Sequence, residues 1–207
     1  MKNIKTKTIL LFVCVSIFAV CAEASLYNDP NAMADFKNKT SFSITMSGKT
    51  LKADVEYAVY APGDYQGDDQ TDGSEYIYAY QISNSTQSNV AIDFFSVGLI
   101  DSSYADYIYT DTTYGTPGGK DPFAFSFPQS AGYMFIGDAL NPGQWSDVLI
   151  FSSTYSPTIG FGTVSGGGLC GMGSLPTPSM LLPEPATIIF LAPTILILRI
   201  KKMTRVK

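Results

Sequence analysis

Short runs in which apolar and polar residues alternate recur along the chain between residues 25 and 162. A period of two places successive side chains on opposite faces of an extended chain, whereas an amphipathic helix needs a stripe that recurs every 3.6 residues. No window shows such a stripe over three turns. The clearest alternating run, residues 75–84, places large apolar side chains on one face at Tyr76, Tyr78, Tyr80 and Ile82. The pattern therefore predicts an all-β domain.

Nine segments carry this signal and are separated by clusters of Gly, Pro, Asn and Asp. They are residues 41–46, 51–60, 75–84, 90–100, 104–110, 122–127, 132–137, 145–152 and 158–164. Short strands at regular spacing, rich in Tyr, Phe, Val and Ile, are typical of an antiparallel β-sandwich. We expect about eight or nine strands, in either a jelly-roll or an immunoglobulin-like arrangement.

The composition changes abruptly after residue 164. Residues 165–174 are rich in glycine, and a proline-rich stretch follows them. Glycine favours flexibility and proline favours stiff extended chain, so the combination is typical of a spacer. The sequence therefore predicts a β-sandwich domain over residues 25–164 and a spacer over residues 165–182.

The first residues have the layout of an export signal. Lys2, Lys5 and Lys7 precede an apolar stretch of 14 residues at 9–22, and small residues follow at Ala22 and Ala24. An apolar stretch of this length is short for a membrane span of roughly 20 residues and suits the core of a signal peptide. We expect a signal peptide over residues 1–24, cleaved between Ala24 and Ser25. The alternatives are an N-terminal membrane anchor and a lipoprotein modified at Cys21, which Val20 disfavours because a small residue normally precedes that cysteine.

A second membrane signal follows the predicted spacer. The tripeptide Pro183-Glu184-Pro185 leads into an apolar run of 13 residues at 186–198. Basic residues come after the run, at Arg199, Lys201, Lys202, Arg205 and Lys207. A helix of 13 residues spans about 20 Å, against a hydrocarbon core of about 30 Å. The run is therefore a short transmembrane helix and a poor permanent anchor, with its basic tail on the cytoplasmic side. This layout is typical of a signal that is recognised in the membrane and then removed.

These residues resemble the PEP-CTERM sorting domain of Gram-negative bacteria, which would occupy residues 183–207. The resemblance covers the tripeptide Pro183-Glu184-Pro185, the apolar run and the basic tail. It departs from the family in having Leu182 where a smaller aliphatic residue usually stands. The resemblance implies that an exosortase, an integral-membrane cysteine transpeptidase, processes the chain and directs it to the cell surface or to an exopolysaccharide matrix. An ordinary tail anchor is the alternative.

The composition excludes several classes of function. The chain contains no histidine, which excludes Ser-His-Asp and Cys-His nucleophile sites and every zinc site that uses imidazole. Between residues 25 and 183 there are 16 acidic and 5 basic residues, giving 5 − 16 = −11 against −5 for the whole chain. Such a charge argues against nucleic-acid binding. No phosphate-binding, dinucleotide-binding or metal-ligand motif is present, so we expect neither a cofactor nor enzymatic activity.

Two groups of residues could bind ligands. The acidic loop at 64–75 could offer carboxylates to calcium, but we prefer its interpretation as a solvated turn between strands. Its candidate ligands are Asp64, Asp68, Asp69, Asp72 and Glu75. The tyrosines could stack on sugar rings, but tyrosine also packs well in strands, which is the interpretation we prefer. The single tryptophan, Trp145, is expected to anchor the core, and Cys170 is expected in the spacer as an incidental thiol or an intermolecular disulfide.

The sequence thus favours a non-catalytic exported protein at the cell surface or in the extracellular matrix. Its expected partners are the exosortase, the membrane before processing, and then exopolysaccharide or other matrix proteins. A carbohydrate-binding module, with or without calcium, is the main alternative. A secreted hydrolase that works with carboxylates alone is the third hypothesis.

Overall fold

The computed structural model describes residues 25–99, 104–127 and 129–179, and this part of the chain is all-β. Within these residues, ten strands form two antiparallel five-stranded sheets, and two short 3-10 helices precede the first strand. The helices are η1 (Leu26–Asn28) and η2 (Ala34–Phe36). The strands are β1 (Lys37–Met46), β2 (Lys49–Tyr60), β3 (Tyr76–Asn84), β4 (Phe94–Gly98), β5 (Ile108–Asp111), β6 (Phe123–Phe127), β7 (Ser130–Met134), β8 (Val148–Ser153), β9 (Pro157–Gly166) and β10 (Leu169–Pro178).

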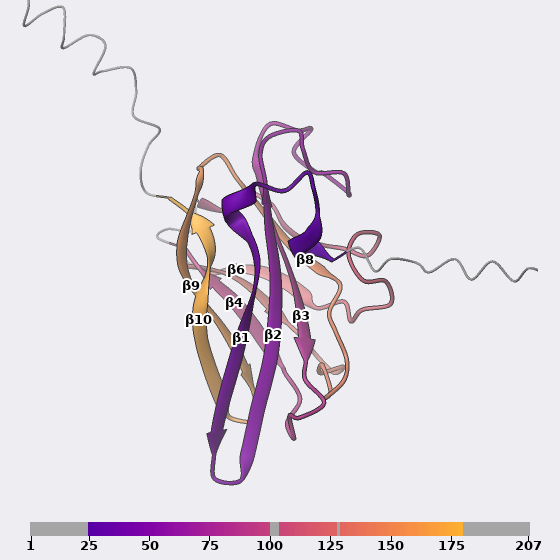
Figure 1. Cartoon of the computed structure of the whole chain (residues 1–207), viewed down its shortest axis with the longest axis vertical. Coiled ribbons are helices and arrows are strands. Elements are labelled where there is room, and N and C mark those ends of the chain that lie inside the picture. The colour runs from indigo at the N-terminus through magenta and orange to yellow at the C-terminus, as the bar shows by residue number, and fades with distance from the viewer. Residues whose placement is uncertain (1–24, 100–103, 128, 180–207) are drawn as a thin grey trace, which may run out of the picture.

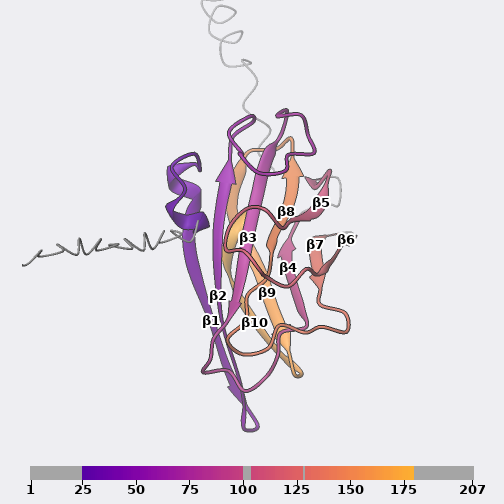
Figure 2. The same ribbon diagram turned by 90° about the vertical axis from the view of Figure 1, so that its right-hand side faces the viewer.

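The two sheets lie face to face as two layers (Figures 1 and 2). The first sheet has the strand order β1-β2-β3-β8-β5, and the second has the order β10-β9-β4-β7-β6. Hairpins join β1 to β2, β6 to β7 and β9 to β10, and the first of these is the long one that reaches the lower end of Figure 1. Each of the nine predicted strands overlaps an observed strand, so the prediction of an all-β, antiparallel domain is confirmed.

Buried aromatic rings fill the space between the sheets. Tyr78 stacks on Phe151, with ring centroids 4.7 Å apart, and Tyr80 contacts Phe95 of the second sheet at 5.7 Å. The hydroxyl of Tyr80 donates a hydrogen bond to the carbonyl oxygen of Pro176 at 2.6 Å. A buried hydroxyl is costly without a partner, so this bond fixes β3 of the first sheet against β10 of the second.

The strand β10 corrects one prediction. The spacer expected at 165–182 is wrong for its described part, because residues 169–178 pair with β9 along their whole length. Gly167 and Gly168 have positive φ values of 59° and 82°, which a type I′ hairpin turn requires at both central positions. The glycines therefore mark a turn, and the domain extends beyond residue 164 to at least Pro178.

The two glycines within β10, Gly171 and Gly173, allow the two sheets to meet at one edge. A Cβ atom on Gly173 would lie 2.8 Å from the ring of Phe42 in β1, and one on Gly171 would lie 3.5 Å from the same side chain. The Thr40 hydroxyl donates to the carbonyl oxygen of Ser174 at 3.1 Å, which joins the same two strands. Glycine is needed at position 173, because the ring of Phe42 occupies the room that a side chain would take.

A second apolar cluster covers part of the outer face of the first sheet. Its buried members are Leu26, Ala32, Ala58, Tyr60, Tyr65, Ile77, Ala79, Tyr109, Val148 and Ile150. The carboxylate of Asp29 accepts hydrogen bonds from the hydroxyls of Tyr60 and Tyr114. The backbone carbonyl oxygen of Asp29 accepts one from Lys37 Nζ at 2.6 Å. These contacts fix the segment at 25–36 against the sheet.

Gly173→Val tests the role assigned to β10. The added side chain has to displace Phe42, so we expect a loss of about 1–3 kcal/mol in the free energy of unfolding. Ser174→Val is the matched control, because Ser174 is the next residue on the same strand and its side chain is exposed. Urea unfolding measures both variants. Equal midpoints for the two variants would show that residues 169–178 are not packed as described.

Candidate functional site

The residues of the predicted export and sorting signals lie outside the described residues, except for one. Those outside are Ala24, Pro183, Glu184, Pro185, Arg199, Lys201, Lys202, Arg205 and Lys207, together with the apolar run at 186–198. Ser25, the residue expected after cleavage, is the first described residue, and its hydroxyl donates a hydrogen bond to Glu56 Oε2. Within the part of the chain that the structure describes, no helix is both long and apolar enough to span a bilayer.

The acidic loop does not gather its carboxylates around one point. Asp64, Asp68 and Asp72 are exposed, whereas Asp69 accepts hydrogen bonds from the amide and hydroxyl of Thr71 at 2.8 and 2.7 Å. Among residues 25–99, 104–127 and 129–179, no group of three or more Asp, Glu, Cys or His side chains is placed to hold a metal ion. The structure therefore offers no support for the calcium alternative.

A carboxylate outside the loop holds it in place. Asp111, at the end of β5, accepts hydrogen bonds from the hydroxyl of Tyr65 and the amide of Asp68, both at 2.8 Å. The same carboxylate accepts from the amide and hydroxyl of Thr113, both at 2.7 Å. Burial raises the pKa of Asp111, but the hydrogen bonds outweigh burial and hold this pKa below its usual value.

The tyrosines suggested as a sugar platform are mostly core residues. Tyr78 and Tyr80 are fully buried between the sheets, Tyr109 is buried under the acidic loop, and Tyr76 is half-buried. Burial raises the pKa of Tyr80 well above its usual value. Packing is therefore confirmed as the role of Tyr78, Tyr80 and Tyr109, whereas Tyr107 is 46% exposed.

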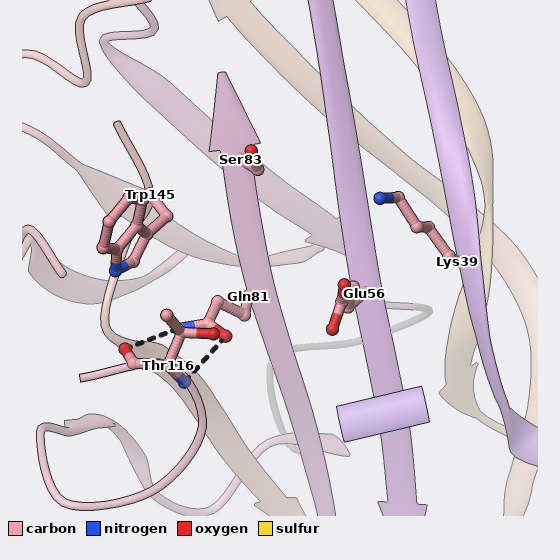
Figure 3. A pocket seen from close by; sticks show the side chains of 6 residues that line it. All are labelled: Lys39, Glu56, Gln81, Ser83, Thr116 and Trp145. Atoms are coloured by element: carbon pink, nitrogen blue, oxygen red, sulfur yellow. Dashed lines mark hydrogen bonds between the residues drawn. The ribbon is translucent and has the colours of Figure 1, made fainter. Parts of the chain in front are cut away.

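Trp145 is not a core residue, which corrects the prediction. Its side chain is 38% exposed and borders a hollow of about 180 Å³ on the outer face of the first sheet. The other lining residues are Lys39, Glu56, Gln81, Ser83 and Thr116. Figure 3 shows the indole on one side of β3 and the side chains of Glu56 and Lys39 on the other. The segment before β8 carries Trp145 to this place because its backbone forms a β-bridge with Ser83.

Backbone and amide hydrogen bonds make one wall of this hollow rigid. Gln81 donates through Nε2 to the carbonyl oxygens of Thr116 and Ser146, at 3.2 and 2.9 Å, and it accepts from the amide of Thr116 at 3.2 Å. Trp145 Nε1 donates to the carbonyl oxygen of Pro117 at 3.3 Å. The indole is thus held at its nitrogen while part of its surface stays open to solvent.

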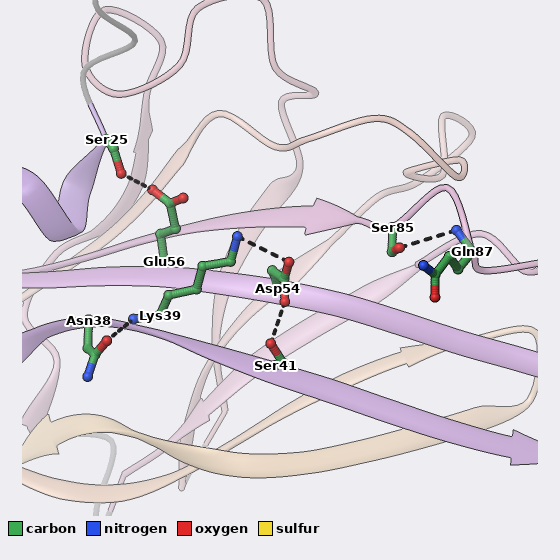
Figure 4. Close-up of polar contacts among 8 residues, drawn as sticks. All are labelled: Ser25, Asn38, Lys39, Ser41, Asp54, Glu56, Ser85 and Gln87. Carbon is green, nitrogen blue, oxygen red and sulfur yellow. Dashed lines mark hydrogen bonds and ion pairs between the residues drawn. The ribbon is translucent and has the colours of Figure 1, made fainter.

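A second hollow of about 290 Å³ lies further along β2, and Ser41, Lys52, Asp54 and Gln87 help to line it. We call the combined surface the polar strip, and Figure 4 shows much of it. Its members are Lys39, Ser41, Lys52, Asp54, Glu56, Ser83, Ser85 and Gln87. From residue 52 to residue 56 the strip measures about 13 Å along the strand.

The two carboxylates of the polar strip are engaged in structural contacts. Asp54 forms an ion pair with Lys39 Nζ at 3.1 Å and accepts a hydrogen bond from the hydroxyl of Ser41 at 2.6 Å. Glu56 accepts from the hydroxyl of Ser25, as described above. An open aromatic surface beside several hydrogen-bonding groups is suited to holding a polar ligand. The arrangement favours binding over acid–base chemistry at these carboxylates.

Cys170 lies on β10 and not in a flexible spacer. Its side chain is exposed and free. Alternation along the strand places it on the outer face of the second sheet, beside Ser165 of β9.

Asp111→Asn tests the anchoring of the acidic loop. The amide cannot accept all the hydrogen bonds that the carboxylate accepts, so we expect a loss of about 1–3 kcal/mol in the free energy of unfolding at pH 7. Because the folded-state pKa is depressed, this stabilisation is present above the unfolded-state pKa and is lost as the pH falls through the folded-state pKa.

The difference between wild type and Asp111→Asn should therefore shrink below about pH 4 in urea unfolding experiments. Asp64→Asn is the matched control, because Asp64 is an exposed carboxylate of the same loop, and it should leave stability unchanged. An equal loss in both variants, or a difference that does not vary with pH, would contradict the role of Asp111.

Comparison with known proteins adds no relationship to these observations. The sequence matches no family model, and the searches against curated proteins and against solved structures return no match.

Proposed function

We propose that the protein is an exported, non-catalytic β-sandwich protein that an exosortase sorts to the cell surface or to an extracellular polysaccharide matrix. The observation that carries this proposal is the order of Pro183-Glu184-Pro185, the apolar run at 186–198 and the basic tail, together with the export signal at residues 1–24. The export signal delivers the chain through the inner membrane. The short apolar run then holds it there as a transient anchor until it is processed.

The strand order supports a jelly-roll arrangement over the immunoglobulin-like alternative. From β3 to β9 the chain passes from one sheet to the other at every connection except the hairpin β6–β7. Repeated crossing between two sheets is characteristic of the jelly roll, with its two Greek keys. The hairpin β1–β2 then extends the first sheet, and β10 extends the second.

The absence of histidine and the engaged carboxylates of the polar strip support a non-catalytic role. Asp54 and Glu56 lie two residues apart on one face of β2, so they are the pair that a hydrolase hypothesis would choose. Both already accept hydrogen bonds within the protein, and Asp54 also forms an ion pair. We therefore place the carbohydrate-binding alternative ahead of the hydrolase.

The exposed indole of Trp145 favours a binding function at the polar strip. Trp145, the single tryptophan of the chain, is partly exposed and borders the polar strip. Aromatic faces flanked by hydroxyl, amide and charged groups suit a sugar, whose ring has an apolar face and hydrogen-bonding edges. We propose that the second function of the domain is to bind a glycan along the polar strip, with the indole of Trp145 against a sugar ring.

The sorting proposal predicts a mass change that depends on the exosortase. The protein, tagged immediately before residue 183, is expressed in a host with and without its exosortase, and its mass and location are compared. We expect a shorter, surface-located product only where the enzyme is present. A variant with Pro183, Glu184 and Pro185 all changed to Ala keeps the apolar run and the basic tail, and it should stay full-length in the membrane. The same mass and location in both hosts would show that the segment is an ordinary tail anchor.

Trp145→Ala tests the glycan proposal. Loss of one aromatic contact should weaken retention in affinity electrophoresis with matrix polysaccharide by about five- to tenfold. Tyr107→Ala is the matched control, because Tyr107 is also an exposed aromatic residue, at 46%, and does not line the hollow. The proposal fails if the wild type does not bind, or if both substitutions weaken binding equally.

A further inference from the structure

The outer face of the second sheet is apolar and exposed. Alternation along its strands turns one set of side chains into the core and the other set outward. The large outward side chains are Phe94, Phe123, Phe125, Phe127, Met134, Ile159, Phe161 and Met172. Phe123, Phe161 and Met172 are 63%, 66% and 70% exposed, respectively. We call this set of residues the apolar face.

Ring packing keeps the apolar face ordered. Phe125 contacts Phe123, Phe127 and Phe94, with ring centroids 6.0, 4.7 and 6.1 Å apart. A Cβ atom on Gly132 would lie 3.0 Å from the ring of Phe125, so the missing side chain on β7 makes room for that ring. These contacts hold the rings as a fixed platform before any partner binds, which reduces the entropy lost on association.

The apolar face is also free of charge. None of the five strands of the second sheet contains Asp, Glu, Lys or Arg, whereas β1, β2 and β5 of the first sheet contain seven such residues. The lack of charge in these strands contrasts with the domain as a whole, since residues 25–183 carry a formal charge of −11. An exposed surface that lacks charge on so acidic a domain indicates an interface.

The area of the apolar face is suited to a stable interface. At roughly 200 Å² for a fully exposed side chain of this size, the exposed fractions of its six most exposed members correspond to about 700 Å². The largest apolar patch of an ordinary monomer covers about 300–600 Å². A standard protein interface buries about 800 Å² on each partner. The face is thus larger than a typical monomer exposes and close to what one side of an interface needs.

The shape of the face is compatible with its own copy. One row across the sheet runs from Phe125 through Gly132, Ser96 and Thr163 to Met172, according to the strand register. Large side chains therefore stand at both ends of the row and small ones in the middle. A two-fold axis that lies between the middle of the row and one of its ends can place the large side chain at that end of one copy against the small ones of the other.

The placement of the charged residues allows two copies to meet through the apolar face. Two copies with a formal charge of −11 each repel one another in most orientations, and contact through the apolar face places no charged strand residue opposite another. We propose that this face binds the same face of a second copy, forming a two-fold dimer in which the second sheets pack against each other. Each polar strip then faces away from the interface, which gives the dimer two separate binding surfaces. The dimer does not depend on the identity of the sorting enzyme or of the glycan.

Met172→Glu and Phe161→Glu test this interface. Each places a negative charge where the two copies meet, so each should weaken association at least tenfold. Met46→Glu is the matched control: Met46 is 57% exposed at the far end of β1 and carries the same substitution. Sedimentation velocity of the full chain, purified from exporting cells, is measured over a hundredfold range of concentration, and urea unfolding confirms that each variant is folded.

We expect dimers for the wild type and Met46→Glu, and monomers for the two variants on the face. The segments outside the described residues are identical in all four proteins, so a difference between them belongs to the face. A wild type that stays monomeric overturns the proposal, whether the face is then found to bind lipid vesicles or a segment of its own chain. Dimers that persist in Met172→Glu and Phe161→Glu, or that dissociate equally in Met46→Glu, overturn it as well.

Discussion

The structure depends on the aromatic packing that joins the two sheets at Tyr80. This ring lies between Phe151 of its own sheet and Phe95 of the facing sheet, with centroids 5.9 and 5.7 Å away. Its hydroxyl donates a hydrogen bond to the carbonyl oxygen of Pro176. Burying a tyrosine costs less when its hydroxyl has a partner, so the hydrogen bond to Pro176 stabilises β10 in its place against the first sheet. With the inward positions of both sheets committed to this core, the outward positions are left to interact with other molecules.

The two outer faces differ in chemistry because their strands differ in charge. On the first sheet, loops and the segment at 25–36 cover one part, and the polar strip with Trp145 occupies another. On the second sheet, phenylalanine, methionine and isoleucine face outward without any charged neighbour in the strands. One face therefore suits a polar ligand and the other an apolar protein surface. The dimer proposed above would present two polar strips that point away from the shared interface.

The alternation of side chains was enough to predict the all-β fold and nine strands, because half-buried strands repeat every two residues. The alternation did not predict β10, because its glycines suggested a flexible spacer. Gly167 and Gly168 instead form a type I′ turn, and a glycine within the strand leaves room for the ring of Phe42. The partner of the acidic loop was missed because Asp111 lies about 40 residues away in sequence, although Asp111-Thr112-Thr113 has the spacing of an Asx turn. Trp145 was placed wrongly because burial of a single aromatic residue depends on tertiary position. The strand Phe123–Phe127 shows a further limit: its alternation marks two faces but does not say which of them points to solvent.

The glycine- and proline-rich segment at 169–178 is a strand that closes the interior between the two sheets and adds Met172 to the apolar face. Hydrogen–deuterium exchange of the full protein, followed by mass spectrometry, tests this claim most directly. Peptides covering residues 169–178 should exchange far more slowly than unpaired chain, because alternate amides of this edge strand donate hydrogen bonds to β9. Exchange of this segment within seconds, at the rate of unpaired chain, would contradict it.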